Sequence, residues 1–453
     1  MSSVPRYKAI IIGAGPAGLF AAIQLAQTIA TTSTPAFTAT PASESGILIL
    51  ERKEFPGRKL LLSGSGQCNI THAGKMAEFL GRYGGGARPE AAGRFLKPAL
   101  YGFTNDALLS WFSARGIDFE TEENGKIFPA DRRAASILKI LLAEAGRLGV
   151  HIETNRRVCG IEQSPGGFLI QAEIPGTDPA GQGSPVAQTE YLAPAVLIAT
   201  GGASYPRTGS SGDGYALAAS LGHNIVPPRP SLAPVFVRNF ALTPLAGLSF
   251  RGASLALLRA GKRILSAEGD LLITHEGLSG PLILDASRHI APGDSLEINF
   301  VGAALEEFRS RLDAELKANP RRLVRTALAD LGLTKSMAEL FCDLAGIAKE
   351  ETASSLPRAR REALCRLACA CPFEVARLGS REVAMVTAGG VDLAEVNPGT
   401  MESRLTPGLF FTGEVLDIDG DSGGYNLQAA FSTGALAASG VLDRIRVSTR
   451  STG

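Results

Sequence analysis

Short apolar runs and helical patterns alternate over the first 200 residues of the chain. Lys8 to Ile12, Gly46 to Leu50 and Ala195 to Ala199 are almost continuously apolar and are bounded by glycine or polar residues, as buried parallel strands are. Pro16 to Gln27 has apolar positions at helical spacing. The pattern predicts a strand–helix–strand unit of unusual length, because residues 31–45 form a low-complexity Thr, Ser, Ala and Pro insertion.

Further elements are predicted downstream of this unit. Pro129 to Leu148 is typical of an amphipathic helix, with apolar residues repeated on one side. Three alternating segments predict a small antiparallel meander, with a Gly- and Pro-rich loop at residues 175–185 before the last: Val158 to Gln163, Phe168 to Ile174 and Glu190 to Leu192.

The pattern changes after Gly222, where a proline-rich linker begins. Val235 to Phe300 contains short strand-like segments that are typical of a barrel or a sandwich. The next segment is nearly free of strands and predicts four short helices: Glu306 to Ala318, Pro320 to Leu331, Lys335 to Leu344 and Pro357 to Ala370. Strand-like sequence returns at Val383 to Val391 and at Gly408 to Thr412, and a final helix is expected over Tyr425 to Arg446.

Together these elements predict an α/β fold in which a doubly wound Rossmann domain is split by an insert. We place the first part of the Rossmann domain at residues 1–222 and the second part at residues 386–453. The insert then contains a β-barrel-like domain at residues 223–303, a helical subdomain at residues 304–374 and a return strand at residues 375–385.

Composition narrows the classes of partner. The 453 residues include 45 Lys and Arg against 44 Asp and Glu, and this net charge of +1 argues against a nucleic acid or an anionic membrane as partner. The longest apolar stretch, residues 9–26, is interrupted by Gly13, Gly15, Pro16 and Gly18, so we expect no membrane span and a cytoplasmic protein. The six cysteines fit neither a disulfide framework nor a zinc site, and we expect no metal.

Residues 13–18 match the G-x-G-x-x-G fingerprint between the first strand and the first helix. Its glycines allow a tight turn, close approach of the backbone to a pyrophosphate and close packing of the helix, whose N-terminus attracts the anion. The second strand ends at Glu51, a carboxylate suited to the ribose hydroxyls and unfavourable to a 2′-phosphate. The fingerprint therefore predicts dinucleotide binding.

Two further glycine clusters favour FAD as this dinucleotide. Thr200, Gly201 and Gly202 follow one strand, and Gly413 and Glu414 follow another near the C-terminus. Strand ends of this kind suit a ribityl chain and a flavin ring at the start of a helix. The sequence has no second G-x-G-x-x-G, so NADH or NADPH would act only as a transient electron donor.

Over residues 9–434 the chain resembles the BaiN/YhiN-type bacterial NAD(P)/FAD-dependent oxidoreductases, some of which are aminoacetone oxidase-like flavoproteins. The resemblance rests on stretches such as GAGPAGLFAA, ERKEFPGRKLLLSGSGQCNITH, LIATGGASYPRTGSSGDGYALAASLGH and TAGGVDLAEVNPGTMESRLTPGLFFTGEVLDIDGDSGGYNLQAAFSTG. It implies a glutathione-reductase-like Rossmann FAD domain, interrupted by a β-barrel with a small helical subdomain.

The resemblance also implies which residues contact FAD. They are Gly13, Ala14, Gly15, Pro16, Ala17, Gly18, Glu51, Arg52, Lys53, Arg58, Lys59, Ser63, Gly64, Gly66, Cys68, Asn69, Val158, Thr200, Gly201, Gly202, Gly413, Glu414, Asp417, Gly424, Tyr425, Asn426 and Leu427. The family usually has Arg before Cys-Asn and Asn two residues after that Asn, whereas this chain has Gln67 and Thr71, followed by His72. The difference concerns the charge beside the flavin rather than flavin binding itself.

Three residues are candidates for the chemistry. His275, in a turn-rich loop of the inserted domain, would act as a general acid or a substrate hydrogen-bond donor, or would simply pin that loop. Tyr425 would act as a proton donor or as a packing aromatic. Cys68 would lie against the flavin, although no second cysteine lies nearby in sequence to form a redox-active disulfide. Two arginine clusters, at residues 321–325 and 358–361, indicate a solvated face or a phosphate-binding one.

We predict an FAD-dependent oxidoreductase in which hydride passes through flavin N5. The resemblance alone favours NAD(P)H-linked reduction of an activated C=C bond in a small molecule. The alternatives are a flavin-dependent amine or alcohol oxidase, an FAD-dependent RNA-modifying enzyme and a non-catalytic flavin redox sensor. An RNA-modifying enzyme would need a continuous basic surface, which the near-neutral charge does not indicate. The sequence makes no prediction of oligomeric state.

Overall fold

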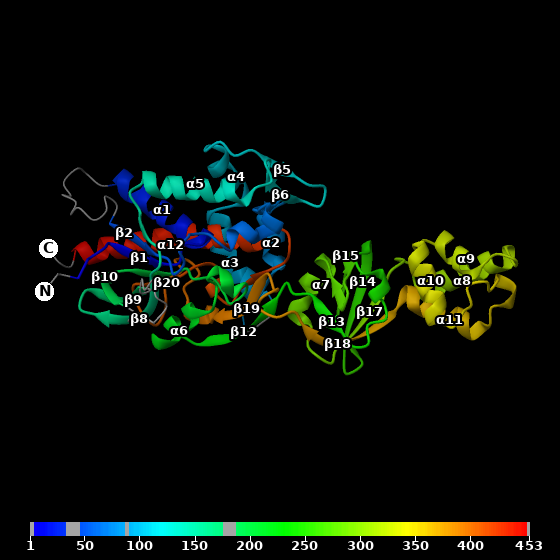
Figure 1. The fold of residues 1–453 in the computed structure, drawn as a ribbon. Helices are drawn as coiled ribbons and strands as arrows, with labels where there is room; N and C mark the ends of the chain where they lie inside the picture. Colours follow the sequence, from blue (N-terminus) through cyan, green and yellow to red (C-terminus); the bar gives the residue numbers. More distant parts are fainter. Residues whose placement is uncertain (1–3, 33–45, 87–89, 175–186, 451–453) are drawn as a thin grey trace, which may run out of the picture. The chain divides into compact units, whose positions relative to one another are not determined.

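The computed structural model describes residues 4–32, 46–86, 90–174 and 187–450 (Figure 1). These residues form two compact units, one from the segments up to residue 229 and from residue 385 onward, and the other from residues 230–384. Most of the predicted insertion at residues 31–45 and the whole predicted loop at residues 175–185 lie outside the described residues.

The first unit is built on a parallel sheet, which within the described residues has five strands in the order β20-β11-β1-β2-β7. The strands are β1 (Ala9–Ile12), β2 (Ile47–Leu50), β7 (His151–Glu153), β11 (Val196–Ile198) and β20 (Leu409–Phe411). All residues of β1 and β2 are buried, which explains why these strands are continuously apolar rather than alternating. This sheet confirms the predicted α/β fold with a Rossmann-type core.

Helices and a small antiparallel sheet cover the parallel sheet. Helices α1 (Pro16–Thr32) and α5 (Ala134–Arg147) lie above it in Figure 1, and the meander of β8 (Arg157–Ser164), β9 (Gly167–Ile174) and β10 (Ala187–Ala193) lies below it. The C-terminal helix α12 (Tyr425–Arg450) packs along α1, and the rings of Phe20 and Phe431 meet edge to face at 5.3 Å.

The helix predicted over Pro129 to Leu148 begins later than expected. Pro129 ends strand β6 (Lys126–Pro129), which pairs with β3 (Thr71–His72) and β5 (Phe119–Thr121). A turn follows in which the Asp131 carboxylate accepts the N–H of Arg133 at 3.0 Å. The buried residues Ile127 and Phe128 precede the predicted helix and belong to this strand. The predicted start was wrong because it assigned Pro129, the last residue of the strand, to the helix.

Shorter elements complete the first unit. They are the helices α2 (Met76–Phe79), α3 (Ala91–Gly102), α4 (Asn105–Ser113) and α6 (Asp213–Ser220), and the strands β4 (Tyr83–Gly84), β12 (Ile225–Ser231), β19 (Val386–Val391) and β21 (Asp419–Gly420). Strand β12 pairs with β19, and β4 pairs with β21.

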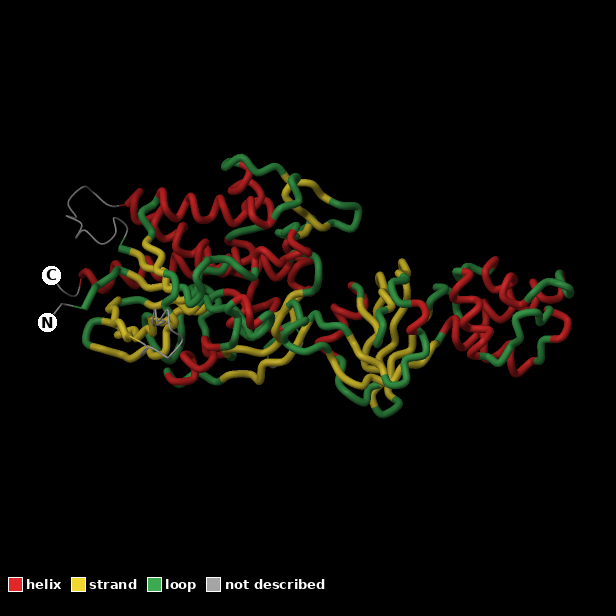
Figure 2. Tube along the Cα trace, viewed as in Figure 1, coloured by secondary structure: helices red, strands yellow, loops and turns green. Residues whose placement is uncertain are grey.

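In the second unit, six strands of residues 230–384 close an antiparallel barrel in the order β13-β16-β15-β14-β17-β18. They are β13 (Val235–Val237), β14 (Ser249–Arg259), β15 (Lys262–Ile273), β16 (Gly277–Ser279), β17 (Ser295–Asn299) and β18 (Cys371–Leu378), with the short helix α7 (Pro281–Ala286) beside them. The helices α8 (Leu305–Ala318), α9 (Val324–Asp330), α10 (Lys335–Leu344) and α11 (Arg358–Cys369) follow the predicted segments, and Figure 2 shows them gathered at one end of this unit.

One boundary in this unit differs from the prediction. We placed residues 371–374 with the helices, but they begin the barrel strand β18. Buried Cys371, Phe373 and Val375 alternate with exposed Pro372 and Glu374, which is the period of a half-buried strand. Within the described ranges, none of the helices combines the length and the apolar composition that a membrane span needs.

Candidate functional site

In the fingerprint turn at the start of α1, the first and last glycines are packed against backbone, whereas the middle glycine, Gly15, faces open space. A Cβ at Gly13, which has φ +105°, would lie 2.6 Å from the carbonyl oxygen of Ala199, and a Cβ at Gly18 would lie 2.1 Å from that of Gly13. A Cβ at Gly15 would meet none of the described atoms within 4 Å. The turn therefore presents its free helical N–H groups to an open space, as a pyrophosphate site requires.

Glu51 lies at the end of β2, next to this turn. Its buried carboxylate accepts the N–H of Ala14 at 2.9 Å and the N–H of Lys53 at 2.8 Å. Burial raises the pKa of Glu51, while the two backbone hydrogen bonds and the charges of Arg52 and Lys53 act in the opposite direction. Each carboxylate oxygen has a further lone pair, so Glu51 can still accept a ribose hydroxyl.

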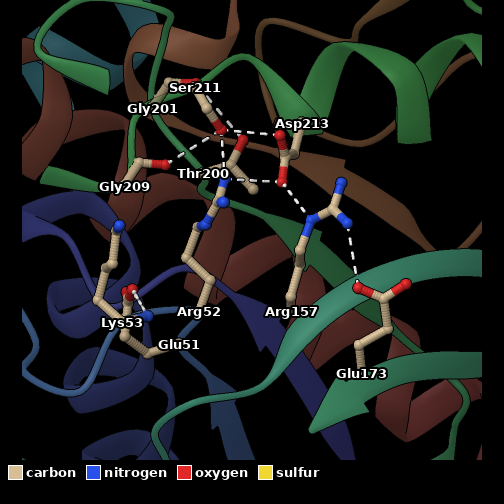
Figure 3. Close-up of polar contacts among 10 residues, drawn as sticks. All are labelled: Glu51, Arg52, Lys53, Arg157, Glu173, Thr200, Gly201, Gly209, Ser211 and Asp213. Atoms are coloured by element: carbon tan, nitrogen blue, oxygen red, sulfur yellow. Dashed lines mark hydrogen bonds and ion pairs between the residues drawn. The ribbon is translucent and has the colours of Figure 1, made fainter. Parts of the chain in front are cut away.

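A network of charged side chains begins at the next residue (Figure 3). Nη1 of Arg52 donates to Asp213 Oδ2 at 2.8 Å and also contacts Ser211 Oγ. Arg157, from β8, donates from Nε to the same Asp213 oxygen at 3.1 Å and pairs with Glu173 at 3.0 Å. Burial opposes the ionisation of Asp213, but the hydrogen bonds of Ser211 and Arg157 and the charges of both arginines lower its pKa overall.

A second network joins three of the segments predicted to contact FAD. Nζ of Lys59 donates to Glu414 Oε2 at 2.7 Å and to Ser204 Oγ at 2.6 Å. The other oxygen of Glu414 accepts the hydroxyl of Ser204 at 3.1 Å and the N–H of Thr387 at 2.9 Å. The structure thus ties the segment after β2, the loop after β11 and the turn after β20 to one another.

The loop at residues 63–69 is folded against the start of α12. Oriented to satisfy its neighbours, the Asn69 amide accepts the N–H of Gly424 at 3.2 Å and donates to the carbonyl of Thr71 at 2.9 Å. Cys68 is fully buried, and burial raises the pKa of its thiol to about 12. At neutral pH Cys68 is therefore a neutral thiol, whose contact with a flavin would be packing rather than thiolate chemistry.

Tyr425 begins α12 within a group of aromatic rings. The His72 ring stacks on it with centroids 5.1 Å apart, and the Phe79 and Tyr83 rings meet it edge to face at 5.0 and 6.3 Å. Both ring nitrogens of His72 lie within hydrogen-bond distance of backbone carbonyls, those of Ala73 and of Asn124. This packing accounts for the burial of Tyr425, and its role as a proton donor stays a prediction.

Two other predicted cofactor residues hold neighbouring parts of the chain. The Asn426 amide accepts the N–H of Gly420 at 2.8 Å and donates to its carbonyl at 2.8 Å. The buried Asp417 accepts the N–H of Gly86 at 2.7 Å. Burial raises the pKa of Asp417, and the negative charge of Asp419 adds to the effect.

The remaining predicted cofactor residues also lie in the first unit. Arg58 is exposed, Val158 is buried in β8 next to Arg157, and Leu427 is half-buried against the core. Ser63 donates its hydroxyl to the carbonyl of Leu60 at 2.7 Å. Pro16 and Ala17 begin α1, and the other predicted cofactor residues lie in turns or after strand ends: Gly64, Gly66, Thr200, Gly201, Gly202 and Gly413. Their contacts with FAD stay predictions.

His275 belongs to the other unit. It is exposed on the turn between β15 and β16, where its carbonyl accepts the hydroxyl of Thr243 at 3.0 Å. The turn is closed by the N–H of Thr274, which donates to the carbonyl of Gly277 at 2.9 Å. The catalytic role of His275 therefore stays a prediction.

The two arginine clusters of the helical segment are largely paired with acids. The pairs are Arg322 with Glu315 and Asp330, Arg325 with Glu339, Arg358 with Glu362, Arg360 with Glu351, and Arg361 with Asp313. This pairing favours a solvated, charge-balanced face. All six cysteines lie among the described residues, and each is a free thiol.

Sequence reasoning missed several members of the two networks. Ser211 and Asp213 follow the glycine cluster at residues 200–202 in the stretch TGGASYPRTGSSGDG, so a search for polar residues after that cluster would have found them. Arg157 and Thr387 carry no local signal, because strand pairing and chain crossings bring them to the site.

Comparisons with known proteins identify the family of this chain. The family described as "HI0933-like protein Rossmann domain" matches residues 7–440. The chain is 33% identical to the 3-dehydro-bile acid Δ4,6-reductase of Clostridium scindens, covering 96% of this chain and 98% of that protein. It is 31% identical to the ribosomal RNA dihydrouridine synthase of Haemophilus influenzae, covering 94% and 96%. Among solved structures, the chain is 17% identical to the 3-ketosteroid-Δ4-(5α)-dehydrogenase of Rhodococcus jostii, over 98% of each chain, with a TM-score of 0.48.

Proposed function

The chain belongs to the HI0933-like family of FAD-dependent oxidoreductases, and from this premise we propose that it reduces a carbon–carbon double bond conjugated to a carbonyl in a small organic molecule. The observation that carries the proposal is the shared chemistry of two relatives with different substrates. One is named as a bile acid Δ4,6-reductase and the other as a dihydrouridine synthase, and each name describes saturation of a conjugated C=C bond.

The residues of the first unit fit FAD. The open turn at Gly15 would receive the pyrophosphate, Glu51 would accept the ribose hydroxyls, and the segments joined by Lys59 would surround the flavin half in a glutathione-reductase-like arrangement. When bound, FAD would supply hydride transfer at its N5 atom. We propose NADH or NADPH as the electron donor.

The protein's own groups would position the reactants and manage one proton. Neutral Cys68 and the ring group around Tyr425 would keep water from the flavin side, since they are buried and apolar or aromatic. A proton must reach the carbon that does not receive hydride, and Tyr425 and His275 are our candidates for its donor.

Charge favours a small molecule over RNA. The net charge is +1, and most arginines of the helical clusters pair with acids, so these clusters offer little uncompensated positive charge for a phosphate backbone. A uracil base in RNA is the second candidate substrate, and the observation that favours it is the name of the Haemophilus influenzae relative.

The first test is the visible spectrum of the purified protein, recorded anaerobically while NADH and then NADPH are added. We expect flavin absorption near ~450 nm that bleaches with one nicotinamide and recovers when a conjugated enone is added. Absence of flavin, even after incubation with FAD, would contradict the proposed function. Recovery with uridine-containing RNA but not with enones would move the RNA reaction ahead.

A further inference from the structure

Arg52 leaves most of its hydrogen-bonding capacity unused by the protein. Among the described residues, only its Nη1 has partners, Asp213 and Ser211. Nε and Nη2 remain as donors on a planar cation, one residue beyond the carboxylate that is suited to a ribose. Lys53 adds a second cation, whose Nζ makes no hydrogen bond or ion pair within the described part of the chain and acts on Glu51 only through its charge.

The loop at residues 203–212 lies against this pair of cations. A Cβ built on Gly209 would be 3.3 Å from Cγ of Lys53 and 3.8 Å from Cδ of Arg52, and Gly209 has φ +117°. Asp213 follows the loop as the first residue of α6. Its carboxylate thus holds Arg52 and the end of the loop at the same time.

We propose that Asp213 is a positioning residue for the cofactor, which orients Arg52 so that its free donors face the adenosine diphosphate half of FAD. The inference rests on the proposed FAD site. Nothing in the fingerprint itself orients the Arg52 side chain, which is 30% exposed and carries a flexible stem. The Asp213 carboxylate, which Arg157 of β8 also contacts, fixes the guanidinium in one direction.

A comparison of the affinities for ADP and for FMN distinguishes a positioning role of Asp213 from a general loss of loop stability. ADP contains the half that Arg52 would face, and FMN contains the flavin half. Asp213→Asn keeps the side-chain shape and removes the charge, so Arg52 is released toward solvent. A loop that merely became less stable would bind both fragments less well.

The experiment measures the dissociation constants of FAD, ADP and FMN for the apoprotein by calorimetry. We expect Asp213→Asn to raise the dissociation constants of FAD and ADP by about tenfold each, and to change that of FMN by less than about twofold. Arg52→Gln should give the same pattern, and the double variant should be no weaker than either single one, since both act through one contact. If Asp213→Asn does not fold, Asp213→Glu, which keeps the charge but moves it away from its contact with Arg52, takes its place and should give the same pattern.

Asp294→Asn is the matched control. Asp294 is a buried acid of the other unit, and its pKa is lowered mainly by a hydrogen bond from Arg259, at 2.8 Å. This variant should lower stability without changing any of the three affinities. Equal losses for ADP and FMN, or no loss for either, in Asp213→Asn and Arg52→Gln would overturn the inference. If the wild-type protein takes up no FAD, the proposed function fails and the inference fails with it.

Discussion

Two glycine-rich regions of the first unit use glycine for different purposes. In the fingerprint region, residues 13–18, the middle glycine faces open space. In the C-terminal glycine region, residues 413–424, the glycines press on other parts of the protein: a Cβ at Gly424 would lie 2.5 Å from the carbonyl carbon of Thr71, and one at Gly413 would lie 3.0 Å from Cβ of Ala17. Gly13 and Gly18 are also closely packed, so among the glycines compared it is Gly15 that leaves space for ligand approach.

The carboxylic acids of the two regions also have different electrostatic surroundings. Beside the fingerprint, Asp213 lies between two arginines, and its pKa is lowered. In the C-terminal region, Asp417 is buried near other acids, and its pKa is raised. The first environment leaves positive donors available for an anionic ligand, whereas the second holds loops together at an electrostatic cost.

The largest effect is expected from Gly424→Ala. The residue has φ +97°, and the new Cβ would collide with the backbone of Thr71, which has no flexible end to move away. We expect the free energy of unfolding of the apoprotein to fall by about 3 kcal/mol, measured by urea denaturation. A variant with unchanged stability but lost FAD binding would show that this glycine serves the ligand, and the comparison would fail.

Gly15→Ala should give the opposite pattern. Its Cβ meets none of the described protein atoms within 4 Å, but it would occupy the space proposed for the pyrophosphate. We expect the dissociation constant of FAD to rise about 50-fold, or about 2.3 kcal/mol, while the stability of the apoprotein changes little.

Gly146→Ala is the control for this variant. Gly146 lies in α5, where a Cβ would likewise meet no described atom within 4 Å, and the change should leave FAD affinity unaltered. Equal FAD affinities in Gly15→Ala and Gly146→Ala would argue that the pyrophosphate binds elsewhere.

The sequence could predict those elements of the molecule that a local pattern determines. Periodicity was sufficient for the buried strand Ala9–Ile12 and for helices such as α8 and α10, because a local pattern determines which face is buried. It was misleading at Pro129, which ends a strand although proline is also common at the first position of a helix; the helix begins only after the polar turn at residues 131–133.

The site was predictable only where its residues are local. The fingerprint carries a spacing that chemistry requires, Glu51 follows the next buried strand, and the two lie together as expected. The contact of Arg52 with Asp213 spans 161 positions, and that of Thr387 with Glu414 depends on the chain returning from the insert. Such contacts are set by sheet topology, which apolar periodicity does not encode.

The smallest effect, and the sharpest in sign, concerns Asp417→Asn. Burial and the charges of Asp419 and Asp392 raise the pKa of Asp417 in the folded state, against the hydrogen bonds from Gly86 and Gly389 that lower it. The folded protein therefore binds this proton more tightly than the unfolded chain, so Asp417 makes the protein less stable as the pH rises through its folded pKa.

Replacing it by Asn, whose amide oxygen can still accept the N–H of Gly86, should make the protein more stable than wild type at pH 7.5 by about 1 kcal/mol. The difference should shrink as the pH falls below the ordinary pKa of Asp of about 3.9, where both states of the wild-type protein come to carry the proton. Asp213→Asn should show the opposite dependence, because a carboxylate with a lowered pKa adds stability at neutral pH that is lost as the pH falls through that pKa. Urea denaturation of the three proteins between about pH 2.5 and pH 8 measures both slopes, because the contribution of Asp213 is lost only below the ordinary pKa of Asp of about 3.9. An Asp417→Asn protein that is less stable than wild type by the same amount at every pH would mean that this carboxylate stabilises the fold. The two regions would then not differ in charge as argued.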